Sequence, residues 1–256
     1  MITHYYRPKT MDEALKILLK PNTCPLGGGT TLNRSVTGSL HVIDLQSLGL
    51  DRIQKSGDRL VMGATVKIQS LLESAYTPEA LKASIKLEAP LNLRNMMTIA
   101  GTLVTCNGGS PLAVNLLALD AILTIVGHNA ESRKISHFNI GNFLPLRTEL
   151  LQKKMITRIE IPSNIALAFD SVARTPADKP IVSVSIAHWQ NGRTRLVVGG
   201  WGKNPSLVMD GTGMDGWESA IMNACHESGD HSASSEYRCR TSLVLAQRCW
   251  EKIQTV

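Results

Sequence analysis

Apolar residues near the start of the chain recur at the spacing of a helix. Leu15 and Leu18 fall on one helical face, and the stretch TMDE at residues 10–13 is typical of a capping box that opens a helix. Pro21 follows the last apolar position and would stop the helix there. The sequence therefore predicts a short amphipathic helix that ends before residue 21.

Short apolar runs on either side of a glycine cluster predict two strands, at residues 24–26 and 41–45. The chain between them is long enough for a loop and a helix, so a small β-loop-α-β unit is expected. The turn residues Ser56-Gly57-Asp58 then predict a hairpin between residues 52–55 and 59–62. Helical patterns return at residues 68–74 and 78–86.

The second half of the chain begins with a buried helix-to-strand stretch at residues 112–126 and a strand at residues 156–161 that Pro162 closes. The segment 162–180 is a plausible domain boundary. Beyond it, two antiparallel strands are expected around Asn191-Gly192, at residues 181–189 and 194–198. Two helical patterns, near residues 217–226 and 235–250, end the chain.

The composition indicates a folded chain with an aliphatic core. Of 256 residues, 43% are hydrophobic but only 4% are aromatic. The longest apolar stretch, residues 112–126, is interrupted by Asn115 and Asp120, so no membrane span is expected. The N-terminus carries no recognisable secretory signal. A cytoplasmic location is the resulting expectation.

The net charge of +6 raises the question of a nucleic-acid partner. The basic residues are scattered, their longest runs are the pairs Arg133-Lys134 and Lys153-Lys154, and no aromatic residues alternate with them. No nucleic-acid partner is expected; a solvated surface or an anionic small ligand explains the charge better. The five cysteines are odd in number and contain no C-x-x-C, which argues against a disulfide framework and a metal site.

Two glycine-bearing segments, at residues 27–32 and 98–102, are the best candidates for chemistry. Glycines let the backbone approach a ligand closely, and successive N–H groups can point at one phosphate. A helix that began just after Gly29 would add a partial positive charge. Two such segments could hold a pyrophosphate from both sides.

Each glycine segment taken singly is as well explained by a tight turn. The first segment lacks the third glycine of the dinucleotide-binding pattern G-x-G-x-x-G, and the chain contains no G-x-x-x-x-G-K-[ST]. Neither a Rossmann site nor a P-loop is therefore expected.

The order of the motifs resembles the FAD-binding medium subunit of molybdenum hydroxylases, the xanthine dehydrogenase and carbon monoxide dehydrogenase family. The stretch LGGGTTL at residues 26–32 resembles that family's A-G-G-T-D-L loop, and RNMMTIAGT at residues 94–102 resembles its R-N-x-x-T-I-G-G-N segment. The stretches VIDL at 42–45, GAT at 63–65 and SEYR at 235–238 follow in the family's order. Each motif is weak alone, but together they span nearly the whole chain.

This resemblance implies an α+β fold: a two-subdomain FAD-binding fold of the vanillyl-alcohol-oxidase (PCMH) type, followed by a C-terminal α+β domain with a three-stranded antiparallel sheet and helices. The expected parts are an N-terminal α/β subdomain at residues 1–55, a second α+β subdomain at 56–165 and the C-terminal domain at 166–256. FAD would lie between the first two. The expected FAD-binding residues, with no catalytic or metal-binding residue among them, are Leu26, Gly27, Gly28, Gly29, Thr30, Thr31, Leu32, Thr98, Ile99, Ala100, Gly101, Thr102, Asn107, Ser110 and Ile156.

The resemblance also implies a role in electron transfer. Electrons would arrive from an iron–sulfur small subunit, reduce the flavin, and leave to NAD⁺, oxygen or another acceptor, while a molybdenum-cofactor large subunit binds the substrate. The sequence departs from the family at several positions. A scaffold subunit with weak or lost FAD binding is therefore the alternative. The departures are Thr31 for an acidic residue, Ala100 for a glycine, Thr102 for an asparagine, Val114 for an aspartate and Asp170 for a lysine.

Overall fold

In the computed structural model, helix α1 (Met11–Leu18) begins where the sequence predicts. The Thr10 hydroxyl accepts a hydrogen bond from the backbone N–H of Glu13, and the Glu13 carboxylate accepts one from the N–H of Lys9. Leu15 and Leu18 are buried on one face of the helix. The capping residue and the apolar spacing together explain the start and the orientation of α1.

The structure describes residues 2–32, 38–128, 132–176 and 178–255, which form two units. The first unit comprises Met1–Ser74, Leu91–Thr105 and Ile122–Glu160, and the second comprises Ala75–Pro90, Cys106–Ala121 and Ile161–Val256. Each unit is built from segments that are separate in the sequence. The division of the chain at residues 55 and 165 stays a prediction.

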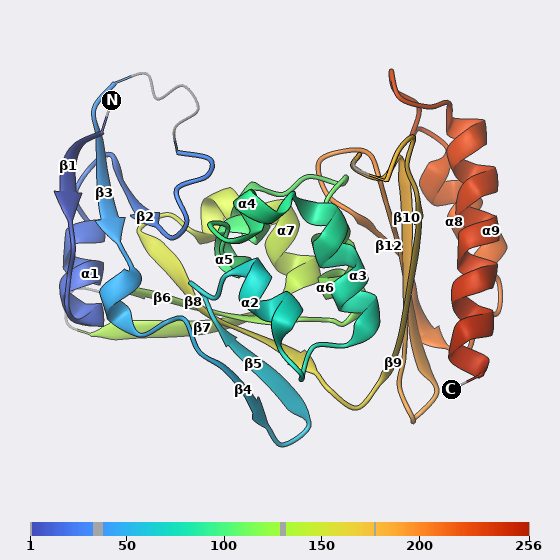
Figure 1. The fold of residues 1–256 in the computed structure, drawn as a ribbon, viewed down its shortest axis with the longest axis horizontal. Coiled ribbons are helices and arrows are strands. Elements are labelled where there is room, and N and C mark those ends of the chain that lie inside the picture. Colours follow the sequence, from blue (N-terminus) through green and yellow to red (C-terminus); the bar gives the residue numbers. More distant parts are fainter. Residues whose placement is uncertain (1, 33–37, 129–131, 177, 256) are drawn as a thin grey trace. The chain divides into compact units, whose positions relative to one another are not determined.

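The first unit contains a parallel sheet in the order β1-β3-β2, drawn in blue in Figure 1. The expected strands of the β-loop-α-β unit are confirmed. The expected helix start after Gly29 is not: residues 30–32 form a turn. Residues 33–37, where the rest of that helix would lie, are outside the described part of the chain. The three strands are β1 (Ile2–Tyr6), β2 (Thr23–Leu26) and β3 (Leu40–Asp44).

A second sheet of the first unit has five strands in the order β4-β5-β8-β6-β7. The predicted hairpin joins β4 and β5, with Gly57 in the left-handed conformation (φ 60°) that glycine adopts without strain. Leu15 of α1, Ile43 of β3, Val126 of β6 and Met155 of β8 share one buried cluster. The strands are β4 (Ile53–Ser56), β5 (Arg59–Gly63), β6 (Ile122–His128), β7 (Arg133–Asn139) and β8 (Lys154–Pro162).

The second glycine segment of the first unit has a different local structure from the turn that its sequence suggests. Residues 99–102 are not a loop but the opening of helix α5, which starts directly after Thr98. The sequence Ile-Ala-Gly-Thr allows this because a single glycine among helix-forming residues is tolerated. The helices are η1 (Gln46–Leu48), α2 (Ile68–Glu73), α4 (Leu91–Arg94), α5 (Ile99–Thr105) and α7 (Ile140–Leu150).

The sheet of the second unit has four antiparallel strands in the order β12-β11-β10-β9, which corrects the expected three. The predicted hairpin around Asn191-Gly192 forms its central pair. The segment expected to be a boundary, residues 162–180, contains β9, which pairs with β10 along seven residues. The strands are β9 (Ala166–Val172), β10 (Val182–His188), β11 (Arg193–Gly199) and β12 (Ser206–Thr212).

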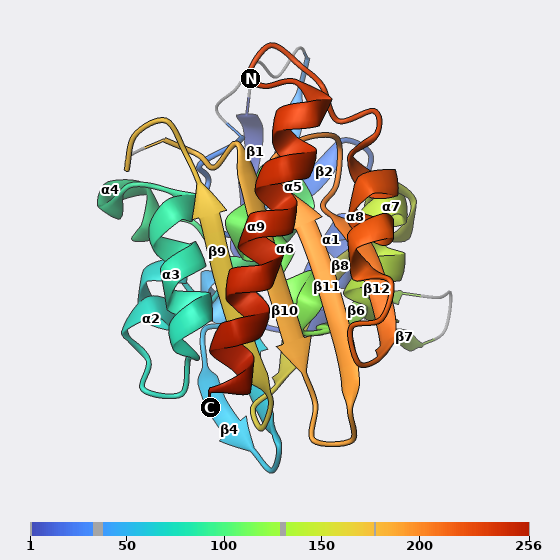
Figure 2. The same cartoon turned by 90° about the vertical axis from the view of Figure 1, so that its right-hand side faces the viewer.

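Both faces of this sheet are covered, which explains why β10 is almost wholly buried. Helices α8 (Trp217–Cys225) and α9 (Ser235–Gln254) pack on one face, where α9 lies along the strands in Figure 2. Helices α6 (Pro111–Ala118) and α3 (Glu79–Glu88) contact the sheet as well.

The side chain of Asn115, on α6, links that helix to the sheet. Its Oδ1 accepts a hydrogen bond of 2.6 Å from the Ser185 hydroxyl of β10, and its Nδ2 donates to the carbonyl of Ala80 on α3. A buried amide of this kind needs such partners, so Asn115 is satisfied inside an otherwise apolar helix.

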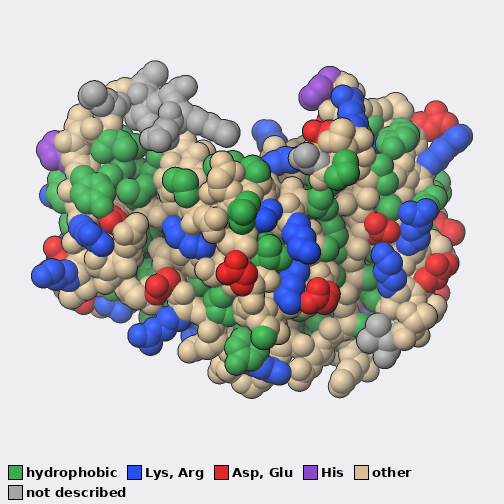
Figure 3. Space-filling view, viewed as in Figure 1, with side chains coloured by type: hydrophobic (Ala, Val, Ile, Leu, Met, Phe, Trp, Pro, Cys, Tyr) green, Lys and Arg blue, Asp and Glu red, His purple; other side chains and the backbone are tan. Residues whose placement is uncertain are grey.

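On the face drawn in Figure 3, Lys and Arg side chains lie among Asp and Glu side chains. Ion pairs occur among the described residues, such as Arg133 with Asp12 at 2.7 Å. None of the helices in the described part of the chain is long and apolar enough to cross a membrane.

Candidate cofactor site

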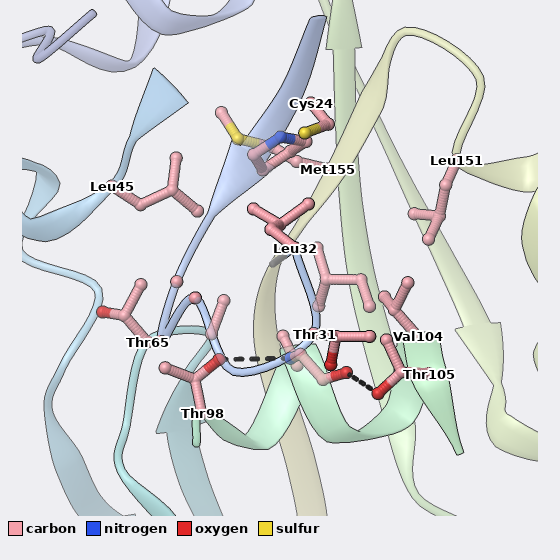
Figure 4. A pocket seen from close by; sticks show the side chains of 18 of the residues that line it. Cys24, Thr31, Leu32, Leu45, Thr65, Thr98, Val104, Thr105, Leu151 and Met155 are labelled. Atoms are coloured by element: carbon pink, nitrogen blue, oxygen red, sulfur yellow. Dashed lines mark hydrogen bonds between the residues drawn. The ribbon is translucent and has the colours of Figure 1, made fainter. Parts of the chain in front are cut away.

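A cavity of about 380 Å³ opens in the first unit, a size in the range of pockets that hold small ligands or part of a cofactor, roughly 300–1,000 Å³. It brings together segments that are far apart in the sequence (Figure 4). These are strand β2 with the turn after it, the start of α5, and the turn that leads into β8. Residues 64–65 between β5 and α2 complete the wall.

Eleven of the fifteen residues predicted to bind FAD line this cavity. Both glycine segments therefore face one space, as the sequence predicts for a clamp around one ligand. The lining members are Gly27, Gly28, Gly29, Thr30, Thr31, Leu32, Thr98, Ala100, Gly101, Thr102 and Ile156.

The four other predicted residues do not line the cavity. Leu26 ends strand β2 and Ile99 is fully buried in α5, so both lie beside lining residues. Asn107 and Ser110 belong to the second unit. Their assignment as cofactor ligands stays a prediction.

The two glycine segments contact each other directly. A Cβ atom on Gly28 would lie 1.9 Å from the carbonyl oxygen of Met96, and one on Gly27 would lie 2.7 Å from Oγ1 of Thr98. Lys67 Nζ donates a hydrogen bond of 3.0 Å to the same Met96 carbonyl, and burial lowers the pKa of this lysine. The glycines are thus needed for the close approach of two backbone segments that together form one wall.

Thr98 fixes the start of α5 at the cavity. Its hydroxyl accepts a hydrogen bond of 3.2 Å from the N–H of Gly101, as an N-cap residue does. The Thr102 hydroxyl donates to the Thr98 carbonyl at 3.0 Å. The Thr105 hydroxyl, labelled in Figure 4, donates to the Gly101 carbonyl at 2.9 Å. These hydroxyls therefore form hydrogen bonds with backbone N–H and C=O groups at the start of α5. The bonds hold the first turn of the helix in place next to the first glycine segment.

The turn after β2 presents the other polar groups. Gly29 has a φ of 72°, which a residue with a side chain rarely adopts. Thr30 and Thr31 follow it in a turn, and within the described residues no hydrogen bond engages either hydroxyl. These two hydroxyls are available to a ligand.

Two cationic residues of the cavity were not among the predicted ligands. Lys153, in the left-handed conformation (φ 53°), and Lys154 both line it, and in the described part of the chain neither forms an ion pair. The only signal in the sequence was the basic pair itself, one of two such pairs. The pair lies at the cavity because strand β8 begins there. Along the chain, the pair follows Gly27, Gly28 and Gly29 by more than 120 residues.

The remaining wall is apolar. Ile156, predicted as a flavin neighbour, is buried in β8 opposite Ile125 of β6, and Met155 precedes it. Cys24 lines the same side, and burial raises the pKa of its thiol. The cavity thus joins a polar, glycine-lined end, with the Thr30 and Thr31 hydroxyls, to an apolar wall.

Two of the residues that differ from the family pattern, Val114 and Asp170, belong to the second unit and contact other residues there. Val114 is fully buried on α6, where its Cγ2 lies 2.4 Å from the place of a Cβ on Gly199. The Asp170 carboxylate lies 3.6 Å from Lys252 Nζ of α9. Val114 therefore packs in the core of its unit, and Asp170 forms an ion pair.

Asn107 and Ser110 also have internal roles. Asn107 Oδ1 accepts a hydrogen bond from the N–H of Gly109, which shapes the loop before α6. The Ser110 hydroxyl caps α6 by accepting from Ala113 N–H and donates to the Glu88 carboxylate at 2.7 Å. Burial raises the pKa of Glu88, whose carboxylate also accepts from the N–H of Leu112.

The described residues fit an FAD molecule. A glycine cradle closed by backbone contacts leaves room for phosphate oxygens next to N–H groups, and two lysines supply positive charge. The apolar wall around Ile156 suits a flat aromatic ring system. Within the described residues, no group of three or more His, Cys, Asp or Glu residues could hold a metal ion.

The chain is similar in sequence to known proteins over nearly its whole length. The YgfM protein of Escherichia coli K12 is 26% identical over 253 residues, which covers 96% of this chain and 94% of that protein. The glyceraldehyde dehydrogenase medium chain of Sulfolobus acidocaldarius is 24% identical over 279 residues and covers 97% of each chain.

The fold also matches a solved structure, carbon monoxide dehydrogenase from Hydrogenophaga pseudoflava lacking the Mo-pyranopterin moiety of its cofactor. The TM-score is 0.80 at 17% identity, over 100% of this chain and 98% of that one. The family described as the FAD-binding domain in molybdopterin dehydrogenase matches residues 1–164. The chain therefore belongs to the family of FAD-binding domains of molybdopterin dehydrogenases, and FAD is its cofactor.

Proposed function

We propose that this chain is the FAD-binding, electron-transferring medium subunit of a molybdenum hydroxylase-type oxidoreductase. The observation that carries the proposal is the cavity lined by both glycine segments and by two lysines. The membership of residues 1–164 in the FAD-binding family supports it.

In this proposal the chain's own residues bind and orient the cofactor. Backbone N–H groups of residues 27–32 hold the pyrophosphate, and the Lys153 and Lys154 ammonium groups neutralise its charge. The N–H groups of residues 99–102 donate within the chain, so the start of α5 forms the facing wall of the site. Ile156 packs against the flavin and excludes water from that side. When bound, FAD supplies the redox chemistry that the amino-acid side chains lack.

No side chain is assigned to acid–base catalysis. In the described residues the cavity lining contains no His, Asp or Glu. In this proposal the protein contributes position and electrostatics to the cofactor.

The proposal includes partner chains. An iron–sulfur small subunit would deliver electrons, a molybdenum-cofactor large subunit would bind the substrate, and NAD⁺ or another acceptor would take the electrons away. The term "medium chain" in the name of the Sulfolobus relative supports a complex of several chains. A cytoplasmic location goes with this proposal and stays a prediction. A scaffold subunit without FAD is not favoured, because the matching family is defined by FAD binding.

The visible absorption spectrum of the purified chain tests the proposal, recorded before and after addition of FAD and again after desalting. We expect a flavin spectrum that survives desalting at close to one FAD per chain. A folded protein that stays colourless after FAD addition would contradict the proposal. Reduction of a dye by substrate with this chain alone would contradict the expected dependence on partner chains.

A further inference from the structure

Strand β6 carries a glycine that belongs to neither of the two glycine segments. Gly127 is buried and pairs with Lys154, the first residue of β8, while Ile125 pairs with Ile156. Side chains alternate between the two faces along a strand, and paired residues of antiparallel strands share a face. Lys154 and Ile156, which both line the cavity, therefore lie on the face where a side chain of residue 127 would be.

The space of the missing side chain at residue 127 is filled by the stem of Lys154. A Cβ atom on Gly127 would lie 2.6 Å from Cγ and 3.3 Å from Cδ of Lys154. The next nearest atom, the carbonyl oxygen of Lys153, would be at 3.6 Å, which is an ordinary van der Waals distance. The Lys154 side chain is thus the group that a methyl group at residue 127 would displace.

The backbone of Lys154 is held in place by its neighbours. Its N–H donates a hydrogen bond of 3.1 Å to the carbonyl of Leu151, which closes the turn before β8. The two residues after it, Met155 and Ile156, are buried. Because the position of Cγ depends on χ1 alone, and χ1 has three staggered positions, relief of a contact at Cγ would redirect the whole Lys154 stem.

The two lysines of the cavity differ in their surroundings. Lys153 is exposed, whereas Lys154 is half-buried, so part of its stem lies against the protein. A lysine in this situation covers protein surface with its methylene groups and keeps its ammonium group in contact with solvent or a ligand. Gly127 supplies surface of this kind for Lys154, and the direction of the stem determines where the charge lies.

From this contact we propose that Gly127 is a positioning residue of the cofactor site. The absence of a side chain lets the Lys154 stem lie over residue 127, which places its ammonium group at the cavity for the pyrophosphate of FAD. The inference rests on the proposed function, because the place of this charge matters to FAD only if the cavity binds it. In the two glycine segments glycine lets backbone segments approach each other, whereas here it makes room for a cationic side chain.

Urea unfolding of the full chain without FAD tests the contact itself. Gly127→Ala should lower the urea concentration at the midpoint of unfolding, because the methyl group meets Lys154 Cγ. In a Lys154→Ala background, which lacks Cγ and Cδ, the same substitution should leave the midpoint unchanged or raise it. If Gly127→Ala alone does not fold, adding Lys154→Ala should restore folding. An equal loss in both backgrounds would overturn the inference.

Titration of the apoprotein with FAD tests the role of the contact. Gly127→Ala should weaken binding about threefold to tenfold, as much as Lys154→Gln does. The double variant Gly127→Ala/Lys154→Gln should bind no more weakly than Lys154→Gln alone, because Gly127 acts through that lysine. Lys153→Gln is the matched control: its side chain does not fill the space at residue 127, so its effect should multiply with that of Gly127→Ala.

The two experiments separate this inference from the proposed function. Wild-type protein that binds FAD, with Gly127→Ala binding it equally well, would overturn the inference and leave the proposed function standing. Wild-type protein that binds no FAD would overturn both, while the unfolding data would still report the contact. Gly211→Ala should change neither the unfolding midpoint nor the affinity by a comparable amount, because a Cβ there meets nothing within 4 Å.

Discussion

A methyl group on Gly27 would lie 2.7 Å from the hydroxyl oxygen of Thr98, the residue that caps helix α5. The same hydroxyl lies 2.8 Å from the place of a Cβ on Gly101. Thr98 thus fills the space that two glycines leave open, one from each glycine segment. This arrangement joins the two segments into one wall of the cavity, although about 70 residues of chain separate them.

We expect this relationship to appear as coupling between two substitutions. Gly27→Ala alone should destabilise the protein by about 1–3 kcal/mol, because the new methyl group meets the Thr98 side chain. Thr98→Ala alone should cost about 1 kcal/mol through loss of the helix cap. The double variant should lose less stability than the two single variants lose together, by about 0.5 kcal/mol or more. Urea unfolding of the four proteins measures the coupling, and simple additivity would contradict it.

Gly28→Ala should be more harmful than Gly27→Ala. The new methyl group would meet the Met96 carbonyl oxygen at 1.9 Å, and a backbone atom cannot rotate away. We expect a loss of about 2–4 kcal/mol of stability together with loss of retained flavin. Gly211→Ala is the matched control, since a Cβ there meets nothing within 4 Å and the residue has no positive φ. Equal stability of the two variants would show that the segments do not contact as described.

The lysines of the cavity should govern the affinity for FAD. Lys153→Gln and Lys154→Gln each remove one positive charge while keeping a long side chain. Each should weaken binding about threefold to tenfold, equivalent to about 0.7–1.4 kcal/mol, and should flatten its salt dependence. Titration of the apoprotein with FAD at two salt concentrations measures both effects. Lys55→Gln, in the β4–β5 hairpin and outside the cavity lining, should change neither.

The buried carboxyl of Glu88 should make stability fall as the pH rises. Burial raises its pKa above the ordinary value of 4.5, so the folded protein binds the proton more tightly than the unfolded chain does. Its contribution to stability is therefore complete below pH 4.5 and is lost as the pH rises through the higher pKa of the folded state. Relative to wild type, Glu88→Gln should gain stability across that interval.

Glu79, on the same helix α3, provides the control with the opposite sign. The Lys82 ammonium group lowers the pKa of the exposed Glu79 carboxyl. The stability of the wild-type protein relative to Glu79→Gln should therefore increase as the pH rises towards 4.5. Chemical denaturation at a series of pH values measures both difference curves. Curves of the same sign would contradict the assigned cause of the Glu88 shift.

The sequence alone determined most of the local elements, the family and its cofactor. Capping residues, apolar spacing and turn residues act over a few positions, so the start of α1, the hairpin at Gly57 and the pair around Asn191-Gly192 could be predicted and are confirmed. The family and its cofactor could likewise be predicted, because the motifs that carry the resemblance are short and keep their order along the chain.

Only the tertiary structure decided what depends on contacts between distant segments. Strands β9 and β12 alternate too weakly to be predicted from sequence, and they are strands because they pair with the buried β10 and β11. Gly28 faces Met96, and Lys153 reaches the glycine cavity, because sheet pairing and helix packing carry these residues together. Local periodicity fixes the type of the strongly patterned elements, but the weakly patterned ones and the pairing of all elements depend on burying apolar faces against one another.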